Sequence, residues 1–496
     1  MVGVLANSVV TVFIRCAQVT TIGGLYMIEH QWGPLLALNQ AHVIMQEEVG
    51  LLSTTDASAI LEVLDELTEL DPDEIADCGQ HPYTYLEHTV IEAVGPVIGG
   101  KLHTGRSKND LMTAVLQLIV RDHLGTVIGR VCTFRDQLLD LAGETTDVVM
   151  PAYTHNQPAQ PITVAHYVLG FDHLLERDVD RLRRAFVTTN QSPLGAAAIG
   201  GTGFGIDRER LAELAGFADI RYNTYDAVAS MDFVMEAANA LAVLRTNLTR
   251  LTADLLNWVT YQYAYATLDE AQFGASSIMP QKRNPGTLES IRASGSEGIA
   301  GAASAMIHFK GIPFGDVGDR RAAAKLSLVD QHAEVCRRID QLSDVIVSLS
   351  FDDARLLADA NASFCTMTEL ADTLVREAGV SFRQAHGIAS RLTDDMTTAG
   401  RTAADITTAD VIDAATAELG EPIAISDAAV EAALDPRQNV TRRETTGGTA
   451  PTQTIRDLER QRTQLADQRE WLEGIRQHIT EADRTRGVQI DRICRA

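Results

Sequence analysis

The sequence predicts an all-α protein built around a long helix bundle. Apolar residues recur three and four positions apart over two long stretches, which is the period of a helix with one buried face. One stretch is the leucine run from Leu241 to Leu255, and the other extends from Leu111 to Leu141. Alternating strand patterns are nearly absent, with Val9 to Ile14 the best candidate. Helices of about 25 to 30 residues are typical of an extended bundle rather than of a globin-like packing.

Two further helices are predicted near the ends of the chain. Ile60, Leu64 and Leu67 form an apolar stripe after Ser53, which is a suitable N-cap. A last helix begins at about Thr454, and its apolar positions recur every seven residues at Leu458, Leu465, Leu472 and Ile479. Arginines occupy the companion positions, so this helix has a single apolar stripe. We expect that stripe to dock on another element.

Composition and charge restrict the partners that the protein can have. Its 496 residues are 45% hydrophobic and 22% charged, which is typical of a globular protein and not of a disordered chain. The 67 acidic and 42 basic residues give a net charge of −25. A protein that follows nucleic-acid phosphates needs the opposite sign. We therefore expect no nucleic-acid partner.

The cysteines and the N-terminal residues predict a cytoplasmic protein. Six cysteines are scattered without a C-x-x-C spacing, which predicts reduced thiols and neither a zinc site nor a disulfide framework. The apolar run from Val4 to Ile14 is too short to cross a membrane, and no Lys or Arg precedes it as a signal sequence requires. A soluble protein without a membrane anchor or a metal is therefore expected, with an export signal as the alternative.

Four segments interrupt the helical pattern with Gly, Pro, Ser and Asn, and loops of this kind often carry function. They are Gly99–Asp110, Met150–Thr163, Ser192–Asp207 and Gly274–Gly286.

The segment from Gly274 to Pro285 has the clearest chemistry. Lys282 and Asn284 could stabilise negative charge that develops on a carboxylate substrate, and the hydroxyl of Ser276 could remove a proton if its pKa were strongly lowered. The alternative is an ordinary Ser/Gly/Pro surface loop.

Two other segments offer polar side chains for binding and proton transfer. In Tyr153–Pro161, His155 titrates near neutrality, and Thr154 and Gln157 offer neutral hydrogen bonds. A structural role for that histidine is the alternative. In Lys101–Asp110, two cations, a Ser and an Asn precede a helix, which is the form of an anion site at a helix N-terminus. Its alternative is a helix cap with solvated basic residues.

Together these segments resemble the argininosuccinate lyase branch of the aspartase/fumarase superfamily, over roughly Gly33 to Ala450. The resemblance rests on four features in order: His103-Thr-Gly-Arg-Ser-Lys-Asn-Asp110, Thr154-His-Asn-Gln-Pro-Ala-Gln-Pro161, Ser192-Pro-Leu-Gly195 with Phe204-Gly-Ile-Asp-Arg208, and the loop from Ser276 to Pro285. The last resembles the hallmark loop of the superfamily. In the first, Lys108 stands where arginine is usual.

The resemblance implies a three-domain lyase that forms a homotetramer, with each active site assembled from three subunits and no cofactor. The expected domains are an N-terminal helical domain over 1–104, a central helix-bundle domain over 105–355, and a C-terminal helical domain with the terminal helix over 356–496. The implied reaction eliminates fumarate from an N-substituted aspartate, most simply argininosuccinate in arginine biosynthesis.

The resemblance also implies roles for individual residues. Ser276 would be the base, and Lys282 and Asn284 would stabilise the aci-carboxylate. His155, paired with Glu289, would act as the acid or charge-relay group. The remaining residues would bind the substrate, at its carboxylates or at its amino acid part: Ser107, Lys108, Asn109, Thr154 and Gln157.

Several positions differ from the usual family pattern, and they concern the half of the site that would hold the amine. An Asp-x-His segment is replaced by His81-Pro-Tyr83, and a later Tyr-Asn-Lys-Asp-Leu-Gln segment reads Asp316-Val-Gly-Asp-Arg-Arg321. The other altered positions are Asn39, Met231, Gly318 and Arg321. Two alternatives to argininosuccinate cleavage therefore stay open: a lyase for a different N-substituted aspartate, and a non-catalytic, crystallin-like paralogue.

Overall fold

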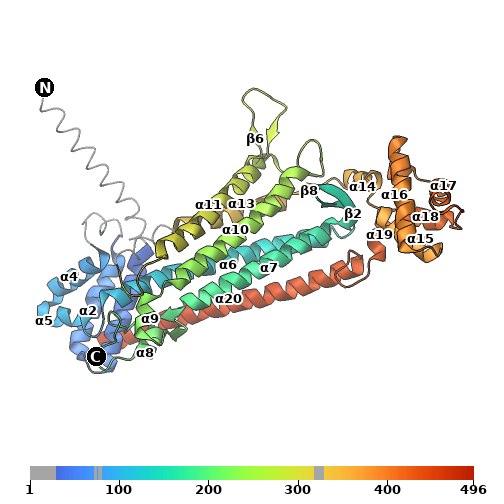
Figure 1. Ribbon diagram of the computed structural model, residues 1–496. Coiled ribbons are helices and arrows are strands. Elements are labelled where there is room, and N and C mark those ends of the chain that lie inside the picture. Colours follow the sequence, from blue (N-terminus) through green and yellow to red (C-terminus); the bar gives the residue numbers. More distant parts are fainter. Residues whose placement is uncertain (1–29, 72–74, 76–80, 318–328) are drawn as a thin grey trace.

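The structure, a computed structural model, describes residues 30–71, 75, 81–317 and 329–496. Long helices lie side by side in an extended bundle, with groups of shorter helices at its two ends (Figure 1). The all-α prediction is therefore confirmed. The strand expected from Val9 to Ile14 lies outside the described residues.

In the described part of the chain, six long helices form the bundle. Both predicted apolar runs are helical and buried: Leu241 to Leu255 lies in α10, and Leu111 to Leu141 lies in α6. The six helices are α6 (Lys108–Glu144), α7 (Val164–Thr189), α10 (Asp232–Trp258), α11 (Gly286–Phe309), α13 (Val329–Ser348) and α20 (Pro451–Cys494).

Among the described residues, α6 alone is long and apolar enough to cross a membrane, but 67% of its most apolar window is buried inside the protein. It contacts α7, α13 and α20, so the bundle core accounts for its composition.

The first end of the bundle consists of short elements around the start of α6. Ser53 caps the predicted helix by accepting a hydrogen bond from the Asp56 N–H, which confirms that expectation. Helical residues 30–48 pack here with these elements: α2 (Thr54–Glu66), η1 (Leu67–Glu69), α4 (Pro82–Val94), α5 (Pro96–Gly99), η2 (Gly100–His103), α8 (Arg208–Leu214) and α9 (Thr224–Ala229).

The opposite end carries a helical group with a core of its own, which includes Leu370, Ile388 and Val411. Its elements are α14 (Asp353–Ala362), α15 (Met367–Glu377), α16 (Phe382–Thr398), η4 (Ala403–Asp405), α17 (Thr408–Leu419), α18 (Asp427–Leu434) and α19 (Pro436–Arg442).

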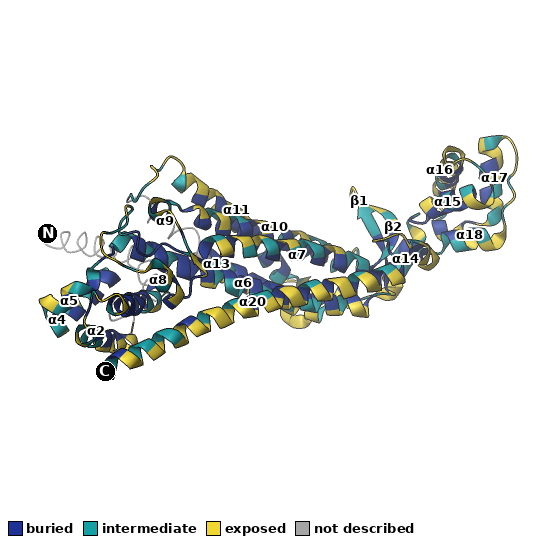
Figure 2. Cartoon of the chain, turned by 90° about the horizontal axis from the view of Figure 1, so that it is seen from below, coloured by how far each residue is buried: buried dark blue, intermediate teal, exposed yellow. Residues whose placement is uncertain are grey.

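The terminal helix α20 returns from this group along the bundle to the first end (Figure 1). Its buried leucines, Leu458, Leu465 and Leu472, belong to the bundle core, while much of its opposite side is exposed (Figure 2). The predicted stripe therefore docks on α6 and α7 of the same chain. Ile479, the fourth position of the stripe, is half-buried.

The described strands form four two-stranded pairs. The longest pair is an antiparallel hairpin of β1 (Val149–Thr154) and β2 (Gln157–Thr163). Sequence patterns predicted only a loop there, because prolines interrupt the alternation. The others are β3 (Gln191–Ser192) with β4 (Asp219–Ile220), β5 (Ala266–Thr267) with β8 (Ser350–Phe351), and β6 (Gly274–Ala275) with β7 (Arg283–Asn284); η3 (Glu270–Gln272) precedes β6.

Candidate active site

The first predicted segment forms the N-terminus of α6. The Ser107 hydroxyl accepts a hydrogen bond from the Asn109 N–H at 3.2 Å, and the Asp110 carboxylate accepts one from the Ser107 N–H at 2.9 Å. The predicted capping alternative is therefore present. Ser107, Lys108 and Asn109 are all half-buried, so a 37-residue helix presents their polar groups at its positive end.

Asp110 joins this segment to the one from Ser192 to Asp207. Its second carboxylate oxygen accepts hydrogen bonds from the N–H groups of Gly195 and Ala197, both at 3.1 Å. Asp110 is fully buried, and burial raises the pKa of its carboxyl although the N–H groups of Ala197 and Ser107 favour the charged form. One carboxylate thus fixes two loops that are 85 residues apart in the sequence.

Gly195 lets the loop after β3 pack closely against the segment from Ile206 to Arg208. Its φ is +77°, and a Cβ atom there would lie 2.8 Å from side-chain carbons of both Ile206 and Arg208. Arg208 also donates a hydrogen bond from Nε to the Leu194 carbonyl at 2.8 Å. Only glycine fits this backbone without displacing either neighbour.

Helix α4 adds an aromatic and acidic wall beside the α6 N-terminus. The Tyr83 hydroxyl donates to Glu87 at 3.1 Å and also contacts the His103 ring nitrogen. The ring of Tyr83 lies 5.8 Å from the guanidinium of Arg106 and 5.9 Å from the ammonium of Lys108. Burial raises the pKa of Tyr83 to about 12. The sequence analysis did not select Tyr83 as a site residue.

Two of the altered positions lie in this wall. His81 caps α4, because its Nδ1 accepts the Tyr83 N–H at 3.2 Å. Asn39 accepts a hydrogen bond at 2.6 Å from Arg106, which is buried. Burial, together with the charge of Arg106, lowers the pKa of His103. The region around α4 therefore combines the cationic Arg106 and Lys108 with one carboxylate, that of Glu87, which accepts a hydrogen bond from Tyr83.

The second predicted segment lies at the tip of the β1–β2 hairpin. Thr154 and Gln157 form the last register pair, and His155 and Asn156 make the two-residue turn between them. Both turn residues have positive φ, 51° and 59°, as in the hairpin turns that match strand twist. The four side chains are exposed, and the turn fixes their spacing. Asn156 also lines a hollow of about 250 Å³ behind the hairpin.

The third segment is a loop between β6 and β7 that projects from the bundle (Figure 1). The Ser276 hydroxyl accepts hydrogen bonds from the N–H groups of Met279 at 3.0 Å and Ile278 at 3.4 Å. Lys282 is exposed, and Asn284 is half-buried within β7. Glu289 is exposed in the first turn of α11, directly after the loop.

One chain does not bring the three segments together. Ser107 and Thr154 lie beyond opposite ends of α6, and a helix of 37 residues is about 55 Å long. The β6–β7 loop is separate from both in Figure 1. Although both residues are described, no hydrogen bond or ion pair joins His155 to Glu289. Each segment instead presents its polar side chains separately: one at the N-terminus of α6, one at the tip of the β1–β2 hairpin, and one in the β6–β7 loop.

The remaining altered positions are only partly described. Gly318 and Arg321 lie outside the described residues. The segment that leads to Asp316 lies against α9, because the Tyr225 hydroxyl donates to the Phe314 carbonyl at 2.8 Å. Met231, which follows α9, occupies the N-cap position of α10.

The chain is similar to known lyases over most of its length. Residues 28–297 match the family described as Lyase, and residues 364–441 match the family described as Argininosuccinate lyase C-terminal. An argininosuccinate lyase of Shouchella clausii is 34% identical over 458 residues, which cover 92% of each chain. An argininosuccinate lyase of Natronomonas pharaonis is 39% identical over 426 residues, 84% of this chain and 82% of the relative.

A solved structure shares the architecture as well. An EDDS lyase variant with bound fumarate superposes with a TM-score of 0.89 at 31% identity, and the match covers 94% of this chain and 93% of the other.

Proposed function

Because the chain belongs to the argininosuccinate lyase family, we propose that it is a carbon–nitrogen lyase that cleaves argininosuccinate into arginine and fumarate. The observation that carries this proposal is the 34% identity to a curated argininosuccinate lyase over nine-tenths of both chains. Both matched families are lyase families, and the three polar segments are present. A place in arginine biosynthesis, in the cytoplasm, follows from this activity.

The proposed reaction is an elimination that needs one base and one acid. The base takes the proton from the carbon beside a carboxylate, which gives an aci-carboxylate. The electron pair left on that carbon then forms the double bond of fumarate as the C–N bond breaks. The departing nitrogen gains a proton and leaves as part of arginine, so atoms and electrons balance.

Ser276 is proposed as the base and His155, with Glu289, as the acid-side group. Ser276 sits in a short hydrogen-bonded turn that holds its hydroxyl in one place. Lys282 and Asn284 would stabilise the second negative charge of the aci-carboxylate, a charge that develops mainly in the transition state. The groups proposed to bind substrate carboxylates or its amino acid part are Ser107, Lys108, Asn109, Thr154 and Gln157.

These roles require more than one copy of the chain, and we propose a homotetramer whose sites are shared between subunits. The separation of about 55 Å between the ends of α6 supports this assembly. So do the exposed apolar side chains of α11, where Ile299, Met306 and Ile307 are between 50% and 70% exposed. Light scattering should give the mass of four chains, and a mass near a single 53.8 kDa chain would contradict it.

Mixing inactive variants tests the shared site directly. Ser276→Ala and Asn109→Ala should each be nearly inactive as homo-oligomers. Hybrids made by unfolding and refolding the two together should recover activity, because some sites then receive both intact segments from different chains. Mixing two preparations that carry the same substitution is the control. Hybrids that contain both chains but recover nothing would contradict the proposal.

The second candidate is a lyase for a different N-substituted aspartate. The likeness to EDDS lyase favours it, and so does His81, which caps α4 and brings no carboxylate to this wall. Fumarate release, followed by its ultraviolet absorbance on argininosuccinate and on a panel of N-substituted aspartates, separates the two. A crystallin-like paralogue would release none from any of them.

A further inference from the structure

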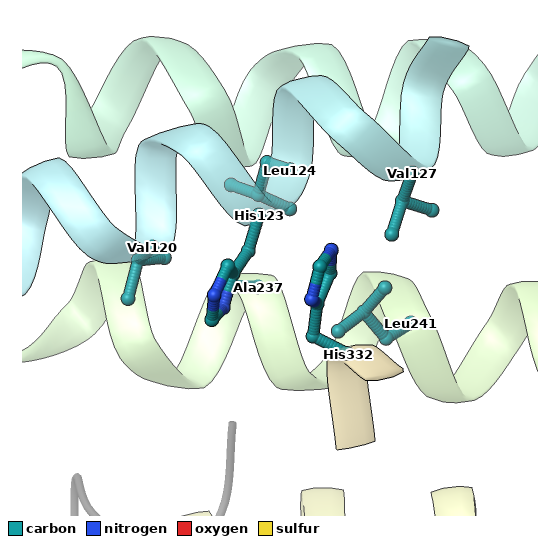
Figure 3. A pocket seen from close by; sticks show the side chains of 7 residues that line it. All are labelled: Val120, His123, Leu124, Val127, Ala237, Leu241 and His332. Atoms are coloured by element: carbon teal, nitrogen blue, oxygen red, sulfur yellow. The ribbon is translucent and has the colours of Figure 1, made fainter. Parts of the chain in front are cut away.

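Helices α6 and α13 meet through a pair of stacked histidines that the proposed reaction does not use. The imidazole rings of His123 and His332 are parallel to within 1°, with their centroids 3.9 Å apart (Figure 3). His30 approaches the ring of His123 edge-on, with centroids 5.6 Å apart and an interplanar angle of 88°. Three imidazoles from three separate helical segments therefore meet at one place.

The stack has an apolar floor and an open, charged outer side. Its floor is formed by aliphatic side chains of α6 and α10: Val120, Leu124, Val127, Ala237 and Leu241 (Figure 3). On the outer side, both rings line a groove of about 560 Å³. The Cys336 thiol lies 3.4 Å from the Nε2 atom of His332.

The charged groups that face the stack are three carboxylates and two guanidinium groups, and two of the carboxylates are already paired with arginines. From α6 these are Asp122 and Arg130, and from α13 they are Arg337, Asp340 and Asp344. Asp340 already accepts hydrogen bonds from Arg130 at 3.0 and 3.1 Å. Asp122 is paired with Arg121 at 3.4 Å. Helix α10 contributes only apolar side chains to this lining.

The geometry does not suit a metal ion. The nitrogen lone pairs of an imidazole lie in its ring plane, so two parallel stacked rings cannot direct them at one ion. Among the described residues, no group of three or more His, Cys, Asp and Glu is placed to hold a metal. The stack is therefore a contact between two rings and not a metal site.

We propose that the His123–His332 stack is an acid-sensitive contact that holds α13 against α6 while both rings are neutral and opens when they are protonated. A proton on either ring places a charge on the apolar floor, and a proton on both places like charges in van der Waals contact. Burial already opposes charging, since it lowers the pKa of His123 to about 3 and that of His332 to about 4. The open state gains hydration for the imidazolium ions and exposes Cys336.

The test compares urea unfolding of the whole protein at about pH 7.5 and about pH 5, on either side of the pKa of a free histidine. The wild-type midpoint should fall at the lower pH. The double variant His123→Phe/His332→Phe retains stacked aromatic rings that cannot titrate, and it should lose at least half of that fall. His386→Gln, which changes an exposed histidine of α16, should behave like the wild type. Equal falls in the wild type and the double variant would overturn the proposal.

A second measurement covers the case in which the double variant does not fold. Thiol labelling of Cys336 in the wild type, divided by its rate in the urea-unfolded chain at the same pH, reports opening independently of thiol chemistry. This ratio should rise at least several-fold at the lower pH, while the ratio for buried Cys132, on α6, stays constant. An unchanged ratio for Cys336 would overturn the proposal, and an equal rise for both thiols would indicate global unfolding instead.

Discussion

Asp110 binds the backbone of Gly195 and Ala197 with one carboxylate oxygen and closes the capping box over Ser107 with the other. This single buried side chain fixes the loop before α6 relative to the loop after β3. The proposed substrate ligands Ser107 and Asn109 are therefore positioned by the loop after β3 as well as by α6.

The first prediction follows from this contact. Asp110→Ala should lower the free energy of unfolding by about 1–3 kcal/mol or more, because it leaves buried N–H groups without acceptors. It should also raise KM, since Ser107 and Asn109 lose their support. Urea unfolding and steady-state kinetics check both effects.

The matched control is Asp136→Ala, which removes an exposed ion pair between α6 and Arg469 of α20. Exposed pairs contribute about 0–1 kcal/mol, so this variant should be nearly as stable as the wild type. Equal losses of unfolding free energy in the two variants would show that the buried contacts of Asp110 stabilise the protein no more than an exposed ion pair does.

The second prediction concerns the attachment of α20. Arg135 and Asp172 form a fully buried bidentate pair at 2.8 and 2.9 Å, and Arg135 also donates to Gln461 and Gln468 of α20. Asp172→Asn should cost about 3–5 kcal/mol, because it leaves the guanidinium charge buried without a counter-charge. The double change Arg135→Met/Asp172→Leu should cost less stability than the sum of the costs of Arg135→Met and Asp172→Leu made separately. Strict additivity in that cycle would contradict this interpretation.

Helical periods made much of the fold predictable, because α6, α10 and α20 each bury one continuous apolar stripe. The β1–β2 hairpin was missed for a local reason. Pro151, Pro158 and Pro161 disrupt the alternation that identifies strands. A two-stranded hairpin tolerates them, since each strand has one free edge. The turn at His155 and Asn156 carries no Gly that would have signalled it.

Candidate site residues could be selected from the sequence by their chemistry, but their geometry could not be predicted. Ser276, His155 and Lys282 stand out by residue type in loops. The contacts of Asp110 with Gly195 and of Tyr83 with His103 join residues far apart in the sequence, and no periodicity encodes them. Nothing in the sequence pattern reveals that Ser107 and Thr154 lie beyond opposite ends of a 37-residue helix.

The third prediction concerns acid stability. The hydrogen bond from Arg401 holds the pKa of Asp410 below its usual range, and hydrogen bonds from the Thr407 hydroxyl and N–H add to this. A carboxyl with a depressed folded-state pKa binds fewer protons in the native state than in the unfolded one. Its stabilisation is therefore complete above the unfolded pKa of about 3.9 and is lost as the pH falls further.

Asp410→Asn should accordingly be less stable than the wild type above about pH 4, with the difference shrinking in stronger acid. Asp413→Asn, an exposed neighbour on α17, should leave the profile unchanged. Thermal unfolding followed across this pH range is the measurement. A stability difference for Asp410→Asn that persists undiminished in strong acid would contradict the proposed charge dependence.

The fourth prediction concerns the elimination itself. Ser276→Ala should lower kcat by roughly 10²-fold or more while assembly stays intact, and Lys282→Met should be comparably severe. Ser277→Ala is the matched control in the same loop and should retain most activity. Retention of more than about a tenth of wild-type turnover by Ser276→Ala would reassign the base, with Ser277 the next candidate.

The last prediction concerns the amine half of the substrate. The arginine half of argininosuccinate carries an ammonium and a carboxylate, and His81 cannot replace a carboxylate as partner to the ammonium. Losing one charged hydrogen bond costs about 1.5–3 kcal/mol, or about tenfold to a hundredfold in affinity. We therefore expect a raised KM for argininosuccinate with a near-normal kcat.

His81→Asp should lower that KM, alone or together with Gly318→Lys, and the structure makes the first change a clean test. His81 is the N-cap of α4, where its Nδ1 accepts the Tyr83 N–H. Aspartate is among the preferred N-cap residues, so its carboxylate can take over this hydrogen bond and α4 should keep its stability. His81→Ala is the matched control: it loses the cap and gains no charge, so it should lose stability without any gain in affinity. A low wild-type KM that His81→Asp leaves unchanged, in a variant as stable as the wild type, would show that position 81 does not select the amine.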